Sequence, residues 1–369
     1  MQTIITRYDD MRIDRLLIKE YQKQLKNDLK TISGLNDIDL LLKGFESTFA
    51  EYIGSRYSFA VNSGTDALQL SLSVLGIKKG DTVIIPDITY PAVPLSIIYA
   101  GAEPIIVDVR KDDLQIDEKQ LGKRIKKNTK AIIAVHMFAR PCGIEAILDF
   151  ARRKGLRVIE DCCQAESSEF KGRKLGSFGD ISCFSFSYYK PLSSCGGGGG
   201  MVCFNDKSLK KVADYTKIWD DQDVLLEAGK RFSRMNLLDL MAVKVKFKFL
   251  KDIIKSRLKI KEIYEKALSG VRGIKIFKDA KDCLSVLQNF VIFSDERDAL
   301  GEHLQRNQVF WQRPYKLLHE MKIFSSFSQG PYNCSHEYAK SALHLPLYSF
   351  MKEDDALAVI DAIISFNSR

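Results

Sequence analysis

The chain has 369 residues, of which 45% are hydrophobic and 28% charged, a composition typical of a folded globular protein large enough for two domains. No apolar run reaches the roughly 18 residues of a membrane span. Acidic residues come early and no apolar signal core is present, so we expect a cytoplasmic protein. The eight cysteines are scattered, without a CxxC pair or a paired Cys/His spacing, so we expect reduced thiols and no metal site.

The formal net charge of +9 is compatible with nucleic acid, an anionic surface or anionic small molecules as partners. The basic residues do not interleave with aromatic residues in a motif typical of nucleic-acid binding, so we expect no nucleic-acid partner. They concentrate in residues 244–261, KVKFKFLKDIIKSRLKIK. This run predicts a long helix with a solvated cationic face. The alternative is loose attraction of that face to acidic phospholipid or to phosphorylated substrates.

Between residues 58 and 206, short apolar runs alternate with helical patterns. The apolar runs are, in chain order, SFAVNS, DTVIIP, EPIIVDV, TKAIIAVHMF and LRVIED. Amphipathic stretches such as TDALQLSLSVLGI and GIEAILDFARRKG lie between them, joined by short turns that contain Gly, Pro and Asp. This alternation predicts an α/β fold with a mainly parallel sheet that helices cover on both faces.

After residue 206 the pattern changes. A helical region without strand signals runs to about residue 268, followed by LSVLQNFVIFS, the helical ERDALGEHLQRNQ, VFWQ and a closing helix in KEDDALAVIDAIISF. These elements predict a smaller α+β domain. We place the boundary near residue 245, so that residues 1–245, including an N-terminal helical segment, form a large domain and residues 246–369 a small C-terminal domain.

Ligands of open α/β sheets bind at the carboxyl ends of the strands, so the residues at these ends are candidates for a site. After SFAVNS, Gly64 and Thr65 open a helix whose free N–H groups and dipole can hold an anion; a plain Ser/Thr cap is the alternative. After DTVIIP, Tyr90 is placed to stack on a planar ring, although a partly buried core tyrosine is the more common role.

Two further strand ends carry polar residues. Asp161 and Gln164 follow LRVIE, and an acid at the end of an apolar strand needs a cationic partner, such as a protonated pyridine nitrogen. A structural salt bridge or helix cap is the alternative. Ser185 lies in the next strand and can offer a hydroxyl to a phosphate. Lys190 leaves that strand beside a glycine-rich stretch, where a lysine can form a Schiff base with a carbonyl compound or with pyridoxal phosphate; a solvated surface lysine is the alternative.

In these segments the sequence resembles the DegT/DnrJ/EryC1/StrS group of pyridoxal-phosphate sugar aminotransferases, which have fold type I. The matching stretches are AVNSGTDALQLSL, GDTVIIPDITYPA, AGAEPIIVDV, VIEDCCQAESSEFKGRKLGSFGDISCFSFSYYK, GGMVCFND and LHLPLYSFMKEDDALAVIDAI. They extend over roughly residues 40 to 365.

The resemblance implies a role for each candidate. Lys190 would bind the cofactor covalently in the large domain, Asp161 would pair with the pyridine nitrogen and Gln164 would contact the ring hydroxyl. Tyr90 would stack on the ring, while the phosphate would be held by Gly64, Thr65 and Ser185. The group forms homodimers with active sites at the interface.

The resemblance also implies a reaction. Most members transfer an amino group, usually from glutamate, to a keto sugar attached to a nucleotide, for surface polysaccharide such as lipopolysaccharide or for a related glycan. A minority dehydrate sugars and have histidine in place of the lysine, so Lys190 favours transamination. A dehydratase or lyase that keeps the cofactor, and a non-catalytic regulatory or scaffold homologue, remain the alternatives.

The sequence departs from the family pattern at two places near the expected cofactor. In the run 230–235, Phe232 stands where the GxNxR motif has asparagine, and Arg231 or Arg234 could replace it as a phosphate ligand. Ser187-Tyr188-Tyr189 replaces the usual histidine-proline run before the lysine, and residues 196–200 are plain glycines where the family has GEGG. Four weaker candidates lie near a region that binds substrate in the family: Trp311, Arg313, Tyr315 and His319. Core packing or surface charge is the commoner role of such residues.

Overall fold

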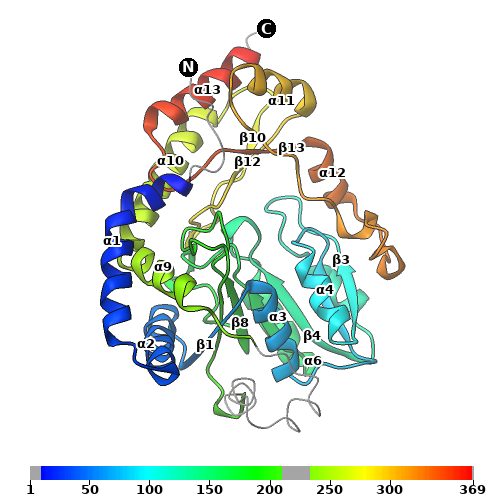
Figure 1. Ribbon diagram of the computed structural model, residues 1–369. Helices are drawn as coiled ribbons and strands as arrows, with labels where there is room; N and C mark the ends of the chain where they lie inside the picture. Colours follow the sequence, from blue (N-terminus) through cyan, green and yellow to red (C-terminus); the bar gives the residue numbers. More distant parts are fainter. Residues whose placement is uncertain (1–9, 210–232, 368–369) are drawn as a thin grey trace.

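A computed structural model describes residues 10–209 and 233–367 of the chain (Figure 1). Its N-terminal part contains α1 (Asp10–Thr31), α2 (Leu35–Ile53), β1 (Tyr57–Val61), α3 (Gly64–Val74), β2 (Thr82–Pro86), α4 (Ala92–Tyr99), β3 (Glu103–Val107), η1 (Glu118–Gln120), α5 (Leu121–Arg124), β4 (Thr129–Val135) and η2 (Met137–Ala139). The middle part contains α6 (Ile144–Lys154), β5 (Arg157–Asp161), β6 (Glu169–Phe170), β7 (Arg173–Lys174), β8 (Ile181–Ser185) and β9 (Gly200–Phe204).

The remaining elements are α9 (Leu237–Lys248), α10 (Leu250–Leu268), β10 (Lys275–Ile276), β11 (Cys283–Leu284), β12 (Phe290–Phe293), α11 (Arg297–Arg306), η3 (Leu318–Glu320), η4 (Ser325–Phe327), α12 (Asn333–Ser341), β13 (Ala342–Leu345) and α13 (Glu353–Asn367). Within these residues, no helix combines the length and the apolar character that crossing a membrane requires.

The central sheet has seven strands in the order β1-β9-β8-β5-β4-β2-β3. The pairs β2/β3, β2/β4, β4/β5 and β5/β8 are parallel, while β9 is antiparallel to both of its neighbours. The predicted α/β class with a mainly parallel sheet is therefore confirmed. Because parallel strands end at the same edge, β2, β4, β5 and β8 bring their carboxyl ends together.

Both faces of this sheet are buried, as the continuous apolar runs of its strands require. Successive side chains of a strand point to opposite faces. Val83 and Ile85 thus join the apolar cluster that includes α3 and α4, whereas Ile84 joins the cluster that includes α6. At the β9 and β8 end of the sheet, residues of α2 and α9 cover Phe184 and Met201. The sheet is a rigid platform on which loop residues at the strand ends can be fixed.

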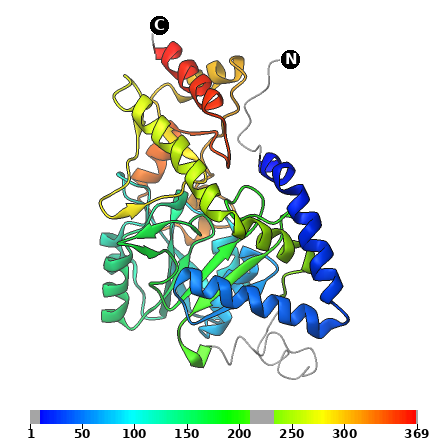
Figure 2. The same cartoon turned by 90° about the vertical axis from the view of Figure 1, so that its left-hand side faces the viewer.

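A second, three-stranded antiparallel sheet, β10-β12-β13, follows in the C-terminal part. Figure 1 shows it above the central sheet, next to α11 and α13, and Figure 2 shows α10 rising beside it. Residues of α10, α11 and α13 form one apolar cluster with β12 and β13, centred on Tyr264, Phe290 and Leu343. The α+β content predicted after residue 206 is thus observed.

The basic run 244–261 does not form one solvated cationic helix, so that expectation is wrong. The run is divided at Phe249 between α9 and α10, and three of its basic side chains are buried: Lys246, Arg257 and Lys261. Lys246 is 1% exposed and donates to the Ser193 hydroxyl at 2.7 Å. Lys244 lies 3.3 Å from the Asp28 carboxylate of α1, a helix that packs along α9 (Figure 2). Several basic side chains of this run therefore form contacts inside the protein instead of facing solvent.

Candidate active site

A cavity of about 470 Å³ opens at the carboxyl ends of the parallel strands. It is lined by all seven residues that the sequence proposes for the cofactor: Gly64, Thr65, Tyr90, Asp161, Gln164, Ser185 and Lys190. They come from four separate segments, and it is the fold that places them side by side. This convergence is what the proposal of a common binding site requires.

The first part of the site is the start of α3. The Ser63 hydroxyl caps the helix by accepting from the Asp66 N–H at 3.1 Å, while the first N–H groups of a helix have no partner within it. Gly64 lies so close to β8 that a Cβ atom would be 2.7 Å from the Cβ of Ser185 and 3.0 Å from the sulfur of Cys163. Only glycine allows this approach, which brings helix N–H groups and the Ser185 hydroxyl to one anion-binding corner.

Asp161 is the last residue of β5 and is 6% exposed. Its Oδ1 accepts from the Cys163 N–H at 3.0 Å, and the side chain lines the cavity. A buried carboxylate is costly without a cationic partner. Asp161 therefore suits a ligand that presents a protonated nitrogen at this wall.

Gln164 is oriented by the backbone. Its Oε1 accepts from the Phe138 N–H at 2.9 Å, and its Nε2 lies 3.5 Å from the Tyr315 hydroxyl. Because the backbone N–H can only donate, the amide must present Nε2, a donor, on its other side. Gln164 can therefore donate a hydrogen bond to a ligand oxygen.

Lys190 follows β8 in a turn, and its Nζ lies 3.3 Å from the Gln288 Oε1. Gln288 comes from the segment before β12, 98 residues further along the chain, so the C-terminal part also contributes to the cavity. Sequence reasoning missed Gln288, since nothing local distinguishes it from a surface glutamine. The contact holds the amine at the cavity.

The glycine stretch after Lys190 packs against Tyr188. Gly197 has φ +76°, and a Cβ there would lie 2.1 Å from the Tyr188 ring. Tyr188 lines the cavity, and 48% of the residue is exposed. The two departures noted in the sequence, tyrosine before the lysine and glycine after it, are thus in direct contact and belong together.

His136 is a cavity residue that the sequence prediction omitted. It directly follows β4 and is fully buried; its Nδ1 accepts from the Cys142 N–H at 3.1 Å, so that Nε2 donates to Glu160 at 3.0 Å. It stands at a strand end, as Tyr90 and Asp161 do. The same criterion applied to TKAIIAVHMF would have found it.

Glu160 anchors the loop beneath the site. Besides His136, it accepts from the N–H groups of Gly176, Phe178 and Gly179 at 2.6–2.9 Å. Burial opposes ionisation, but the His136 and backbone hydrogen bonds outweigh it and lower the pKa of Glu160 below its ordinary value. The loop before β8 is therefore fixed to the end of β5.

Of the four weaker candidates, only Tyr315 lines the cavity. Arg313 lies 2.8 Å from the Asp298 carboxylate on the surface, and Trp311 packs against Gly301 of α11. His319 lies 2.8 Å from Asp87 and outside the cavity lining. Core packing and surface charge thus describe Trp311 and Arg313.

The segment that departs from the GxNxR motif is only partly described, because Lys230, Arg231 and Phe232 lie outside the described residues. Arg234 lies 2.6 Å from the Asp39 carboxylate of α2. The Ser233 hydroxyl accepts from the Asn62 N–H and donates to Asp66, both at 2.9 Å. This segment therefore returns to the start of α3, next to the anion-binding corner.

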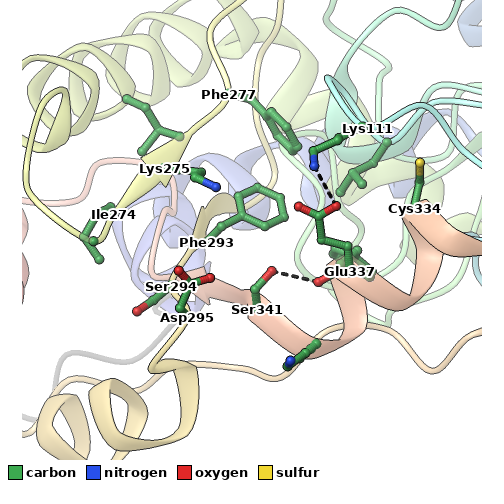
Figure 3. A pocket seen from close by; sticks show the side chains of 15 residues that line it. Lys111, Ile274, Lys275, Phe277, Phe293, Ser294, Asp295, Cys334, Glu337 and Ser341 are labelled. Atoms are coloured by element: carbon green, nitrogen blue, oxygen red, sulfur yellow. Dashed lines mark hydrogen bonds and ion pairs between the residues drawn. The ribbon is translucent and has the colours of Figure 1, made fainter.

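A second and larger cavity, of about 570 Å³, lies beside α12 and the strands β10 and β12 (Figure 3). Phe277 and Phe293 meet edge to face with ring centres 4.7 Å apart, and Lys111 forms an ion pair with Glu337 at 3.0 Å. Figure 3 shows these side chains around the cavity. It contains none of the predicted cofactor residues.

Comparison with known proteins places the chain among aminotransferases. The model of the DegT/DnrJ/EryC1/StrS aminotransferase family matches residues 22–364. GDP-perosamine synthase of Escherichia coli O157:H7 is 29% identical, over 94% of this chain and 96% of that protein. The dTDP-3-amino-3,4,6-trideoxy-alpha-D-glucose transaminase of Streptomyces venezuelae is 29% identical, over 89% of this chain and 87% of that protein. The crystal structure of S. venezuelae DesV in complex with a ketimine intermediate has a TM-score of 0.90 at 28% identity, covering 99% of this chain and 98% of that one.

Proposed function

Because the chain belongs to the DegT/DnrJ/EryC1/StrS aminotransferase family and is a pyridoxal-phosphate-dependent transaminase, we propose that it transfers an amino group from glutamate to a keto sugar carried on a nucleotide. The names of the relatives support this substrate class, since one is a GDP-sugar enzyme and another a dTDP-sugar transaminase. The convergence of Lys190, Asp161 and the α3 N-terminus in one cavity carries the proposal. The product would enter a surface polysaccharide such as lipopolysaccharide.

The residues present fit pyridoxal phosphate. The close approach that Gly64 allows makes a corner for the phosphate with Thr65 and Ser185. The buried Asp161 carboxylate would meet the protonated ring nitrogen, and Gln164 would donate to the ring oxygen. Tyr90 is 61% exposed in the single chain and would cover the ring.

When bound, the cofactor supplies an electron sink for the carbon that gains or loses the amino group. Lys190 is the nucleophile that would hold the cofactor, and once released its Nζ takes the proton from the α-carbon of the amino donor. In the second half-reaction Nζ delivers a proton to the carbon that was the sugar carbonyl. Gln288 keeps Nζ at the cavity between these steps.

The same site supports a homodimer. Tyr90, Tyr188 and Tyr189 line the cavity and are 61%, 48% and 42% exposed. Aromatic rings at a cavity mouth are suited to burial against a second copy of the chain. All eight cysteines, each within the described residues, are free thiols, which supports our proposal of a cytoplasmic location.

Absorption spectroscopy of the purified protein tests the function. With pyridoxal phosphate bound, we expect a visible band that disappears on addition of glutamate and returns on addition of a nucleotide-linked keto sugar, with the amino sugar identified by mass spectrometry. A band that glutamate leaves unchanged would contradict a transaminase that uses this donor. Release of water from the sugar without amination would identify a dehydratase instead.

A further inference from the structure

Two histidines face each other outside the cofactor cavity. His319 lies on η3 and His336 on α12, and their Nε2 atoms are 3.3 Å apart. Neither residue lines the cofactor cavity or the larger cavity of Figure 3. The pair therefore lies outside the lining of the site proposed above.

Carboxylates behind both rings determine where the ring protons lie. Asp87, which is fully buried, has Oδ2 2.8 Å from Nδ1 of His319, and its Oδ1 accepts the backbone N–H of the same residue at 2.9 Å. Glu320 has Oε1 3.4 Å from Nδ1 of His336. A carboxylate favours a proton on the nitrogen that faces it, so the surroundings favour the Nδ1–H tautomer for each neutral ring, more strongly for His319. In this tautomer both Nε2 atoms are unprotonated and face each other at 3.3 Å.

The separation of these two nitrogens matches a shared metal ion. Two ligands at about 2.0–2.1 Å from a tetrahedral zinc ion lie roughly 3.3 Å apart. Imidazoles whose second nitrogen donates to a carboxylate are common metal ligands in proteins. We propose that His319 and His336 bind one divalent transition-metal ion, of the zinc class, between their Nε2 atoms.

The surroundings favour an exchangeable site. His319 stacks on Tyr332 with ring centres 4.1 Å apart and planes 11° apart, and its side chain is only 10% exposed, so one ligand is held rigidly. The His336 side chain is 55% exposed, which gives an ion access from solvent. Ligand atoms of His319, Glu320 and His336 all lie within 4.8 Å of one another, so a carboxylate lies near the pair, and water can complete the coordination.

A second group with suitable spacing, His136, Glu160 and Cys162, is not a comparable candidate. Both nitrogens of His136 and both oxygens of Glu160 are already engaged in hydrogen bonds. At the proposed site, each Nε2 atom has the other as its hydrogen-bond partner among the described residues. A metal ion there would join α12 and η3 to Asp87, in the loop that continues to Tyr90.

Zinc titration of the cofactor-loaded protein by isothermal calorimetry tests the proposal. We expect one Zn²⁺ per chain for the wild type and loss of this binding in His336→Asn, whose exposed position should tolerate the change. Glu337→Gln is the matched control on the same helix, with similar exposure, and should bind as the wild type does. Binding that persists in His336→Asn, or that disappears in Glu337→Gln, would overturn the assignment.

Two alternatives compete with a metal ion held by the two histidines. A nearby thiol could bind the ion, or the two Nε2 atoms could share a proton without a metal ion. Cys334 is partly exposed on the same helix, and Cys334→Ser should leave the titration unchanged; loss of binding in this variant would assign the ion to the thiol. If the wild type binds no Zn²⁺, the two Nε2 atoms share a proton only and the proposal fails. The absorption band of the bound cofactor should be the same with and without Zn²⁺, so this test is independent of transaminase activity.

Discussion

The cavity at the strand ends and the larger cavity beside α12 differ in the residues that line them. The larger one, beside α12, is lined by Phe277, Phe293 and lysines, and its Lys111 is already paired with Glu337. The smaller one collects an anion-binding helix end, a buried carboxylate and an amine from separate strand ends. Size alone would favour the cavity beside α12, whereas convergent polar groups that need partners favour the smaller cavity, which we propose as the site.

The largest effect is expected at Lys190. Lys190→Ala should remove the visible band of the bound cofactor and lower turnover by at least about 10³-fold, because both the covalent attachment and the proton transfer depend on this amine. Spectra and single-turnover kinetics measure the two effects. An unchanged spectrum would mean that the smaller cavity does not hold the cofactor through this lysine.

Next comes Asp161. Asp161→Asn should lower turnover by about 10²–10³-fold, because the amide cannot stabilise a protonated ring nitrogen as the carboxylate does. The visible band should remain, since Lys190 is intact. Normal turnover in this variant would show that the Asp161 carboxylate has only a structural role at the end of β5.

The stabilisation that Glu160 provides beneath the smaller cavity should depend on pH. Glu160→Gln leaves buried donors poorly satisfied and should lower the free energy of unfolding by about 3 kcal/mol at pH 7. Since the pKa of Glu160 is lowered in the folded chain, its contribution is present above its ordinary pKa and is lost as the pH falls through the lowered value. Denaturant unfolding at pH 7 and near pH 3 should show the difference between the two proteins shrinking in acid; a constant difference would contradict an ionised Glu160.

The smallest effect is expected in the larger cavity. Lys275→Ser removes an exposed charge from its wall and should change turnover and the cofactor spectrum by less than about twofold, as surface substitutions usually do. Lys190→Ala is the natural comparison. A large loss of turnover in Lys275→Ser would give the larger cavity a part in substrate binding.

Much of the site was predictable because strand ends are visible in a sequence. An apolar run followed by a polar residue marked Tyr90 and Asp161, and the same pattern marks His136, which was overlooked. The α/β fold, the family, the transaminase activity and the cofactor are confirmed. The individual roles of the site residues and the domain boundary near residue 245 stay predictions.

Contacts between distant segments were not predictable. Gln288 contacts Lys190, which lies 98 residues earlier in the sequence, and no local sequence pattern predicts such a contact. The prediction for the basic run 244–261 was wrong for the same reason. Lys246 and Arg257 are buried, and they donate to groups distant in the sequence, the Ser193 hydroxyl and the Leu287 carbonyl. The two facing imidazoles of His319 and His336 depend on the packing of α12 against η3. They belong to no short metal-binding motif.

The contact between Tyr188 and Gly197 has a consequence for how this loop can change. Any side chain at Gly197 would enter the space of the tyrosine ring, and a smaller residue at position 188 would relieve this clash but not the strain of φ +76°. The two positions are therefore epistatic. We expect a library that randomises position 197 alone to keep glycine, whereas a library that randomises position 188 alone should accept smaller residues.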